Sequence, residues 1–423
     1  MIKEIAIPYD KTTLPLFIDE KNIFSILEPK KREESSESEL DIVRSSLDHP
    51  IASAKLEELA KGKRNIVIIS SDHTRPVPAH ILMPEMLKRI RSTNPKAHIT
   101  ILVATGFHRA STYDELVEKY GKEIVDKEDI VIHSAFTSEC VSVGHLPSGG
   151  NCFINKVAVD ADLLISDGFI EAHLFAGFSG GRKAVLPGIA SDKTIQANHS
   201  GAFISHKMSR SGSLENNLVH KDMVYAAKAV KLAFIVNVTL DESGKIDACF
   251  SGDPIKAHEE GCHFLLERYS FPSPNADIAI SSNGGYPLDQ NLYQAVKGMT
   301  VAEAATVKGG IIIMVASCKD GHGGKAFYEN LINSESPANY FKEASMTPSD
   351  ETKPEQWGSQ ILARILMEHP VYLVSTYLDE KIASALGIKL FKTINEALSE
   401  AYRVKGYDAK VSIIPSGPAV IIT

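Results

Sequence analysis

The residue types best suited to chemistry concentrate in one stretch, Asp167–Gly188, which holds five glycines together with His173 and Lys183. Glycine lets backbone amides come close to a ligand and form a concave site for an anion. The stretch is not a GxxxxGK[ST] phosphate loop, because the lysine has the wrong spacing from Gly177 and Ala184 stands where Ser or Thr is needed. It also lacks GxGxxG. The pattern predicts a ligand-binding turn and leaves the ligand open.

Two further polar segments each follow a short apolar run that is typical of a strand. In Asp72-His73-Thr74-Arg75, the arginine can bind a carboxylate or phosphate through two parallel hydrogen bonds, and Asp72 could orient Arg75 or hold a ribose hydroxyl. A surface salt bridge beside a helix start is the alternative. His108, in the second segment, is suited to acid–base chemistry near pH 7. A histidine with a structural hydrogen bond is the alternative there.

His199 follows the glycine-rich stretch and is a candidate ligand for a soft metal through a neutral imidazole. The five cysteines are widely spaced and form no CxxC pair, and no second His or Cys stands at ligand spacing. A protein that offers one side chain to a metal needs an organic ligand to supply the rest. On the residues alone, His199 is a candidate without a complete site.

A last polar group is expected on a helix opened by Pro287. On such a helix Tyr293 and Lys297 are four residues apart and share a face, with Gln294 beside them. One cation and two neutral hydrogen-bonding groups suit a small carboxylate. An ordinary solvated helix face is the alternative.

Apolar, β-branched runs alternate with helical patterns along the chain, as in α/β proteins whose strands are buried on both faces. The predicted strands cover residues 65–70, 99–103, 161–166, 232–239, 277–281, 310–316 and 371–376. We expect two α/β domains with mostly parallel sheets and an active site in the cleft between them. A segment rich in Pro and Ser, Ser270–Asn275, predicts the boundary and gives domains 1–270 and 271–404.

Charge and hydropathy exclude several classes of function. The chain has 45 Lys and Arg against 53 Asp and Glu, and its formal net charge of −8 provides no attraction to nucleic acid or anionic lipid. No apolar run reaches the roughly 18 residues of a membrane span, and the first residues are charged where a signal peptide needs an apolar run. We therefore expect a cytoplasmic protein with a small-molecule substrate, without a nucleic-acid or membrane partner.

Taken together, these segments resemble the nickel-dependent lactate racemase family. The matching pieces are Ser71–Pro76, Gly106–Arg109, Asp167–Gly188, Asn198-His199 and Tyr293–Lys297, and the likeness extends to Trp357. The resemblance implies a nickel-pincer nucleotide, pyridinium-3,5-bisthiocarboxylic acid mononucleotide, attached to Lys183 through a thioamide. Two sulfurs and a ring carbon of this group hold nickel, and His199 completes the coordination. Cofactor-maturation proteins are then expected partners, and residues 405–423 are expected to return to the first domain.

The resemblance also assigns roles to the other candidates. It implies cofactor contacts for the loop residues Asp72, His73, Thr74 and Arg75. It implies substrate binding by Arg75, Tyr293, Gln294, Lys297 and Trp357. The paired acid–base residues are then His108 and His173.

The implied activity interconverts D- and L-lactate through a bound pyruvate. The C–H beside a carboxylate is a poor acid because the carboxylate is already negative, and hydride transfer to the cofactor avoids a carbanion. One histidine takes the hydroxyl proton while hydride leaves the α-carbon, and hydride returns to either face after the ketone rotates. Two histidines are needed because each enantiomer presents its hydroxyl to a different side.

Two alternatives share the cofactor. A racemase or epimerase of another 2-hydroxy acid keeps every site residue, because one sequence does not reveal what holds the third carbon. A non-catalytic nickel or cofactor carrier needs Lys183 and His199 but neither His108 nor His173, so the histidine pair favours an enzyme. An NAD-dependent dehydrogenase lacks its glycine fingerprint here.

Overall fold

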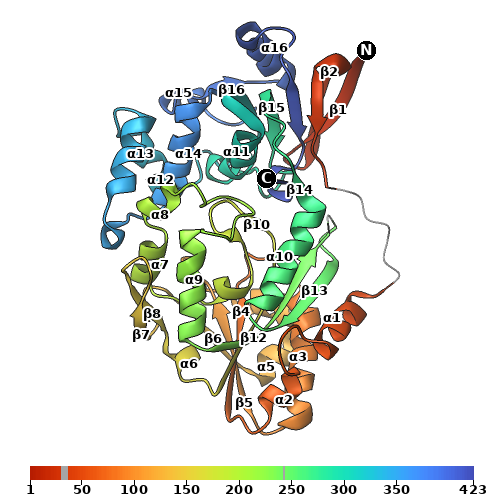
Figure 1. Ribbon diagram of the computed structural model, residues 1–423, viewed down its shortest axis with the longest axis vertical. Coiled ribbons are helices and arrows are strands. Elements are labelled where there is room, and N and C mark those ends of the chain that lie inside the picture. Colours follow the sequence, from red (N-terminus) through yellow and green to blue (C-terminus); the bar gives the residue numbers. More distant parts are fainter. Residues whose placement is uncertain (30–36, 242) are drawn as a thin grey trace.

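The computed structural model describes residues 1–29, 37–241 and 243–423, and each half of the molecule contains one large sheet (Figure 1). The first sheet has six strands in the order β13-β12-β9-β4-β5-β6, and all its neighbouring strands are parallel except β13 and β12. The strands are β4 (Asn65–Ser71), β5 (His98–Ala104), β6 (Asp129–Ile132), β9 (Leu163–Phe169), β12 (Leu232–Leu240) and β13 (Ile246–Gly252).

Helices cover both faces of this first sheet. Alternate residues of β4 enter different clusters, since Ile66 and Ile68 pack on the side of α3 while Val67 and Ile69 pack on the side of α9. The helices of this half are α1 (Glu39–Asp48), α2 (Leu56–Ala60), α3 (Ala79–Thr93), α4 (Tyr113–Tyr120), α5 (Lys122–Lys127), α6 (Lys156–Val159), α7 (Asp192–Asn198), α8 (Gly201–Ser205), α9 (Leu218–Ala229) and α10 (Lys256–Tyr269). Two hairpins complete it, β7 (Cys140–His145) with β8 (Asn151–Asn155), and β10 (Ala172–His173) with β11 (Gly177–Phe178).

The second sheet is parallel throughout, with six strands in the order β18-β17-β16-β15-β19-β3. Its strands are β3 (Ile23–Ile26), β15 (Ala276–Ser282), β16 (Thr306–Val315), β17 (Val371–Val374), β18 (Lys389–Phe391) and β19 (Val411–Ile414). Its helices are α11 (Leu292–Ala305), α12 (Lys325–Ile332), α13 (Pro337–Met346), α14 (Gln356–Glu368), α15 (Glu380–Ala385) and α16 (Ile394–Lys405). The mostly parallel α/β fold expected from the sequence is confirmed.

Strands near both ends of the chain, β3 and β19, belong to the second sheet. The hairpin of β1 (Ile2–Tyr9) and β2 (Thr12–Asp19) packs its buried residues against this sheet, and β3 is an edge strand. β19 pairs with β15 and β3, and β20 (Ile421–Ile422) pairs with β14 (Ser270–Phe271). The expectation was that residues 405–423 return to the first domain. In the structure β19 lies in the second sheet, while Ile421 packs against Ile170 and Cys262 of the first half. All four residues of β19 are buried, so the strand fits the interior of a sheet, and its local pattern does not say which one.

The helix expected to open at Pro287 begins later. α11 starts at Leu292, because the Asn291 side chain accepts a hydrogen bond from the Gln294 amide and forms the N-cap. Pro287 lies in the loop before it. That loop is held by Asn283, whose amide nitrogen donates to the carbonyls of Leu288 and Gln294.

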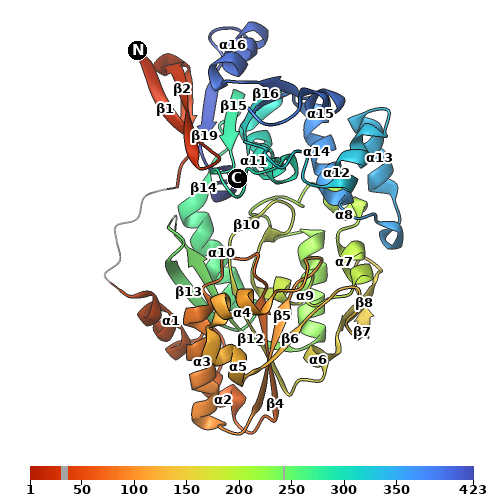
Figure 2. The same cartoon turned by 180° about the vertical axis from the view of Figure 1, so that it is seen from behind.

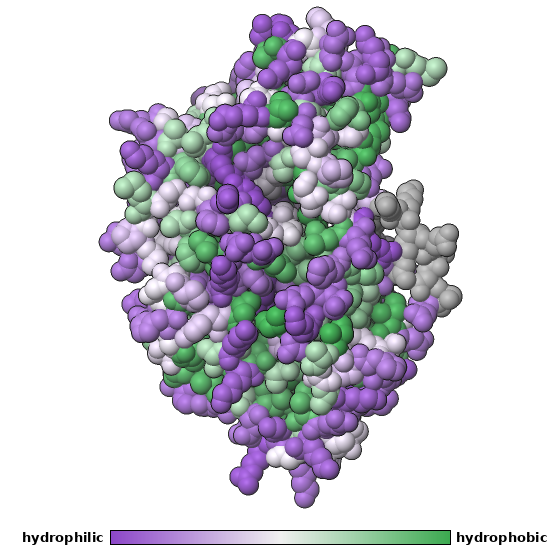
Figure 3. All heavy atoms as spheres, in the orientation of Figure 1, coloured by the Kyte–Doolittle hydropathy of each residue, from purple (hydrophilic) through white to green (hydrophobic). Residues whose placement is uncertain are grey.

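Seen from behind, the two sheets with their helices form separate lobes stacked along the long axis (Figure 2). The space-filling view is hollowed between the lobes, with hydrophilic residues around the hollow (Figure 3). Within the described ranges, no helix combines the length and apolar character that a membrane crossing requires. The placement of a domain boundary near residue 270 stays a prediction.

Candidate active site

The loops after β4 and β5 meet through a hydrogen bond between Asp72 and His108. His108 Nδ1 lies 2.7 Å from Asp72 Oδ2, and Thr74 donates to Asp72 Oδ1 through its amide and its hydroxyl. Asp72 is 1% exposed. Burial acts to raise the pKa of Asp72, but the hydrogen bonds from His108 and Thr74 outweigh it and leave that pKa below its ordinary value. A buried carboxylate therefore orients an imidazole that is itself exposed.

Arg75 leaves the same loop and is exposed. Its guanidinium donates to Thr74 Oγ1 at 3.3 Å, and within the described ranges it forms no ion pair. The donors of Arg75 thus remain available for an anion. His73 points elsewhere, because its Nδ1 contacts the Ser111 hydroxyl at 3.0 Å and the Glu115 carboxylate at 3.7 Å.

The glycine-rich stretch forms the hairpin β10–β11 followed by a 3-10 turn, η2 (Gly181–Ala184), that carries Lys183. Gly177 has φ +78°, and a Cβ there would lie 2.2 Å from the Ser213 carbonyl oxygen, so only glycine fits. Arg182 is fully buried and donates to the carbonyls of Ala176, Ser179 and Gly180 and to His220. This arginine fixes the turn and with it the base of Lys183.

The Lys183 amine makes no hydrogen bond or ion pair with any residue that the structure describes. Burial, followed by the charges of Arg182 and Arg75, lowers the pKa of Lys183 well below its usual value, and Glu171 opposes this. The neutral amine is a nucleophile and can form a covalent bond.

His173 stands next to the same charges. Burial and the charges of Lys183 and Lys297 lower the pKa of His173 well below its usual value. The Ala176 amide donates to His173 Nδ1 at 3.3 Å, so the neutral ring carries its hydrogen on Nε2. His173 therefore offers an N–H group.

His199 lies just beyond the end of α7 and is 6% exposed. Its Nδ1 is buried and has no hydrogen-bond partner among the described residues. Burial and the Lys183 charge lower the pKa of His199 to about 3, against the opposing effect of the Ile195 carbonyl. This neutral imidazole is the form that binds metals. Residues 1–29, 37–241 and 243–423 contain no group of three or more His, Cys, Asp or Glu that could hold an ion.

A series of ring contacts connects His173 with His199 and ends at Phe107, the residue before His108. The ring centroids of His173 and Phe175 are 4.6 Å apart, those of Phe175 and His199 are 5.0 Å apart, and those of His199 and Trp357 are 5.2 Å apart. Trp357 in turn stacks on Phe107, the neighbour of His108, at 6.1 Å and 5°. Because Trp357 belongs to α14 and Phe107 to the loop after β5, the site lies between the two halves.

Helix α11 contributes the remaining polar residues. Tyr293 accepts a hydrogen bond from Trp357 Nε1 at 3.1 Å. Gln294 Oε1 is buried without a partner in the described part of the chain. Burial lowers the pKa of Lys297, with Glu171 acting against it and Arg75 adding to it. The charges of Arg75, Lys183 and Lys297 thus act on one region.

Three site residues were not anticipated from the sequence. Phe107 and Phe175 connect the histidines, and Glu171 is a carboxylate exposed beside the three cations. The neighbouring residues remove part of the water around the Glu171 carboxylate, which raises its pKa, while Lys297, Arg75 and Lys183 oppose the rise. All three lie within two residues of a predicted histidine. This proximity gives no usable signal for the two phenylalanines, because apolar rings next to histidines are common in protein cores.

Comparisons with known proteins agree with this geometry. A lactate racemase N-terminal domain matches residues 9–212, and a lactate racemase C-terminal domain matches residues 272–422. The chain is 56% identical to the lactate racemase of Lactiplantibacillus plantarum and 48% identical to that of Thermoanaerobacterium thermosaccharolyticum, with 99% of both chains covered in each case.

Solved structures give the same result. The lactate racemase apoprotein of T. thermosaccharolyticum superimposes with a TM-score of 0.96 at 48% identity, covering 100% of both chains. A Thermotoga maritima protein shares the fold alone, with a TM-score of 0.66 at 19% identity over 93% of this chain and 100% of that one. The chain therefore belongs to the lactate racemase family, as the resemblance of its motifs led us to expect.

Proposed function

We propose that the protein racemises lactate in the cytoplasm, with a nickel-pincer nucleotide attached to Lys183 and coordinated by His199. The observation that carries this proposal is the series of ring contacts from His173 through His199 and Trp357 to the segment of His108. This series supports the proposal because it links the acid–base candidate His173 to the metal-ligand candidate His199 and reaches the neighbour of His108. The printed names of the relatives support lactate as the substrate.

The residues present fit the cofactor. A single buried imidazole with a depressed pKa can serve a metal only if another group supplies most of its ligands, which the pincer does. Lys183 offers a buried neutral amine without a partner in the described ranges, as a covalent attachment requires. When bound, the nucleotide supplies an acceptor and donor of hydride. We propose that separate maturation proteins deliver it.

His108 is suited to act as the base toward one enantiomer. The Asp72 carboxylate only accepts hydrogen bonds, so the hydrogen of neutral His108 lies on Nδ1 and the lone pair lies on Nε2. Nε2 can then take the proton of the substrate hydroxyl. Asp72 stabilises the imidazolium that results.

His173 is suited to the other enantiomer. Its Nε2–H can donate to the substrate oxygen, and the long hydrogen bond from Ala176 is weak enough for the ring to change tautomer. Lys297 and Arg75 disfavour the imidazolium, so His173 returns its proton readily. The pair thus combines a base supported by a carboxylate with a ring surrounded by cations.

The substrate carboxylate is expected to bind between Arg75 and Lys297, with Gln294 and Tyr293 beside it. Arg75 has free guanidinium donors, and Gln294 has an unpaired amide oxygen among the described residues. The Trp357–Tyr293 hydrogen bond holds both rings against the site and restricts the space for the third carbon. The space left beside Trp357 and Tyr293 also determines whether the site accepts a 2-hydroxy acid other than lactate.

Racemisation of enantiopure lactate, followed by chiral chromatography, tests the proposal. Replacing His108 or His173 with Ala should abolish racemisation and leave nickel bound, because neither residue is the proposed ligand. Intact-protein mass spectrometry should locate the cofactor mass on the peptide of Lys183. Unchanged lactate with the cofactor in place contradicts the substrate assignment, and two active histidine variants contradict the acid–base assignment and favour a cofactor carrier.

A further inference from the structure

Helix α4 contacts both loops that meet at the Asp72–His108 hydrogen bond. Its Glu115 binds the guanidinium of Arg109, the residue after His108, with Nη1 and Oε2 2.8 Å apart. Its Lys119 reaches the loop that contains Asp72 and Arg75. Figure 2 shows α4 in the half of the molecule that contains β4 and β5. No role in the proposed reaction has so far been given to this helix.

The Lys119 ammonium uses all three of its donors on one loop. Nζ lies 3.1 Å from Ser71 Oγ, 3.0 Å from the Asp72 carbonyl oxygen and 3.4 Å from the Arg75 carbonyl oxygen. The Asp72 carbonyl also accepts the Arg75 amide, so these residues form a closed turn around the lysine. An ammonium has three donors and no acceptor, and here the donors match three acceptors of residues 71–75.

The position of Lys119 is itself rigid. A capping box of Thr112 and Glu115 starts α4, and Leu116 and Tyr120 on either side of the lysine are buried. Among the described residues Lys119 forms no ion pair, although burying a lysine costs free energy. Burial lowers its pKa, while the charges of Asp167 and Asp72 oppose this and Arg75 adds to it. Within the described part of the chain, Lys119 therefore binds the 71–75 loop and not a carboxylate.

We infer that Lys119 is a positioning residue, which acts through the 71–75 loop to hold the Asp72 carboxylate on His108 and the Arg75 guanidinium toward the substrate. The inference rests on the proposed function for its effect on turnover, but the arrangement of Asp72 and His108 can be measured without it. Loss of the lysine removes a donor shared by the Ser71 hydroxyl and the Asp72 and Arg75 carbonyls, and the loop then samples orientations in which Asp72 no longer faces Nδ1.

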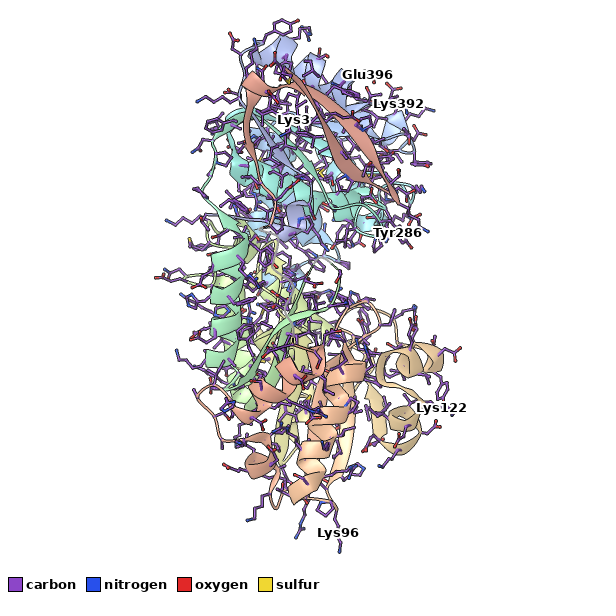
Figure 4. All side chains as sticks on the ribbon, turned by 90° about the vertical axis from the view of Figure 1, so that its right-hand side faces the viewer. Lys3, Lys96, Lys122, Tyr286, Lys392 and Glu396 are labelled. Atoms are coloured by element: carbon purple, nitrogen blue, oxygen red, sulfur yellow. The ribbon has the colours of Figure 1, made fainter. Side chains whose placement is uncertain are left out.

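The test compares Lys119→Met and Lys119→Arg with Lys122→Met. Lys122 is a matched control, because it lies next to α4, is 71% exposed and pairs with Asp126. Figure 4 shows it pointing away from the molecule. The first measurement uses the full-length apoprotein with 15N-labelled histidine, in which the ring resonances of His108 are identified by their loss in His108→Gln.

The parent and Lys122→Met should show His108 with its hydrogen on Nδ1. Lys119→Met should show a mixture of tautomers, and Lys119→Arg, which keeps the charge and the donors, should restore the parent spectrum at least in part. In the cofactor-loaded enzyme, Lys119→Met should lower kcat at least tenfold and raise KM, while Lys122→Met leaves both unchanged.

An unchanged His108 spectrum in Lys119→Met, with kcat within twofold of the control, overturns the inference. If Lys119→Met does not fold, Ser71→Ala removes one acceptor of the same ammonium and takes its place, with the same two outcomes. A changed spectrum in a protein that does not racemise lactate leaves the positioning role standing and refutes the proposed function instead.

Discussion

Replacing Asp72 with Asn separates the charge of this residue from its shape. The Asn side-chain oxygen can still accept from the Thr74 amide and hydroxyl, so the turn is kept. The Asn nitrogen then faces His108 Nδ1, where the carboxylate oxygen was 2.7 Å away. Because the Asn nitrogen only donates, Nδ1 must accept and the ring hydrogen moves to Nε2. His108 then lacks a lone pair toward the substrate.

The size of the effect follows from the hydrogen bond that is lost. A hydrogen bond to a charged group contributes about 1.5–3 kcal/mol. If this is the stabilisation of the imidazolium in the transition state, kcat/KM falls roughly 10- to 150-fold, since each 1.4 kcal/mol is about a factor of ten. Thr74→Val, which removes a neutral donor and keeps the carboxylate on His108, should lose only about 0.5–1.5 kcal/mol.

The assay measures initial rates from D-lactate and from L-lactate separately. The two enantiomers have equal free energies, so kcat/KM must fall by the same factor in both directions. An unequal fall reveals an assay error, because incomplete cofactor loading lowers both values by the same factor. Equal values of kcat/KM for Asp72→Asn and the parent, within threefold, would falsify the assignment of His108 as a base supported by Asp72.

Three further predictions follow from the same contacts. Burial raises the pKa of Asp167 to about 6 from 3.8, so the stability this residue contributes is fully present below pH 4 and is lost as pH rises through 6. The free energy of unfolding of Asp167→Asn minus that of the parent should therefore rise by about 3 kcal/mol from pH 4 to pH 8. An equal difference at the two pH values contradicts this. In the apoprotein, the Lys183 amine should react with an amine-selective reagent at a lower pH than exposed lysines such as Lys96, as peptide mass spectrometry can measure; equal reaction profiles refute its depressed pKa. Lys297→Met should raise KM for lactate more than it lowers kcat, and a change in kcat alone excludes it from substrate binding.

The sequence predicts the strands and the reactive side chains of the site, because both have local signals. A run such as 65–70 is apolar and β-branched wherever it folds, and polar residues after it mark the end of a parallel strand. His108 and Lys183 attract attention by their residue type alone. In the structure His108 lies in the loop after β5, and Lys183 lies in the turn η2 after the β10–β11 hairpin.

What supports those side chains has no local signal. Asp72 and His108 are 36 residues apart, and Lys119 is 47 residues from the carbonyl that it binds. Each contact depends on the order of strands in the sheet, which places β4 beside β5 with α4 following. The return of β19 to the first domain was expected from the resemblance, whereas the structure pairs β19 with β15 in the second sheet. The apolar pattern of this four-residue strand fits either sheet and could not decide between them.

The two proposed acid–base residues have different surroundings, and this difference is compatible with equal kcat/KM values for the two enantiomers. His108 is supported by a carboxylate and is exposed, whereas the charges of Lys297 and Arg75 act on His173. Because the enantiomers have equal free energies, this difference cannot change the ratio of the two kcat/KM values. It can change kcat and KM of one enantiomer only by the same factor relative to those of the other. The asymmetry of the site should therefore appear as one enantiomer that binds more tightly and turns over more slowly, by one common factor.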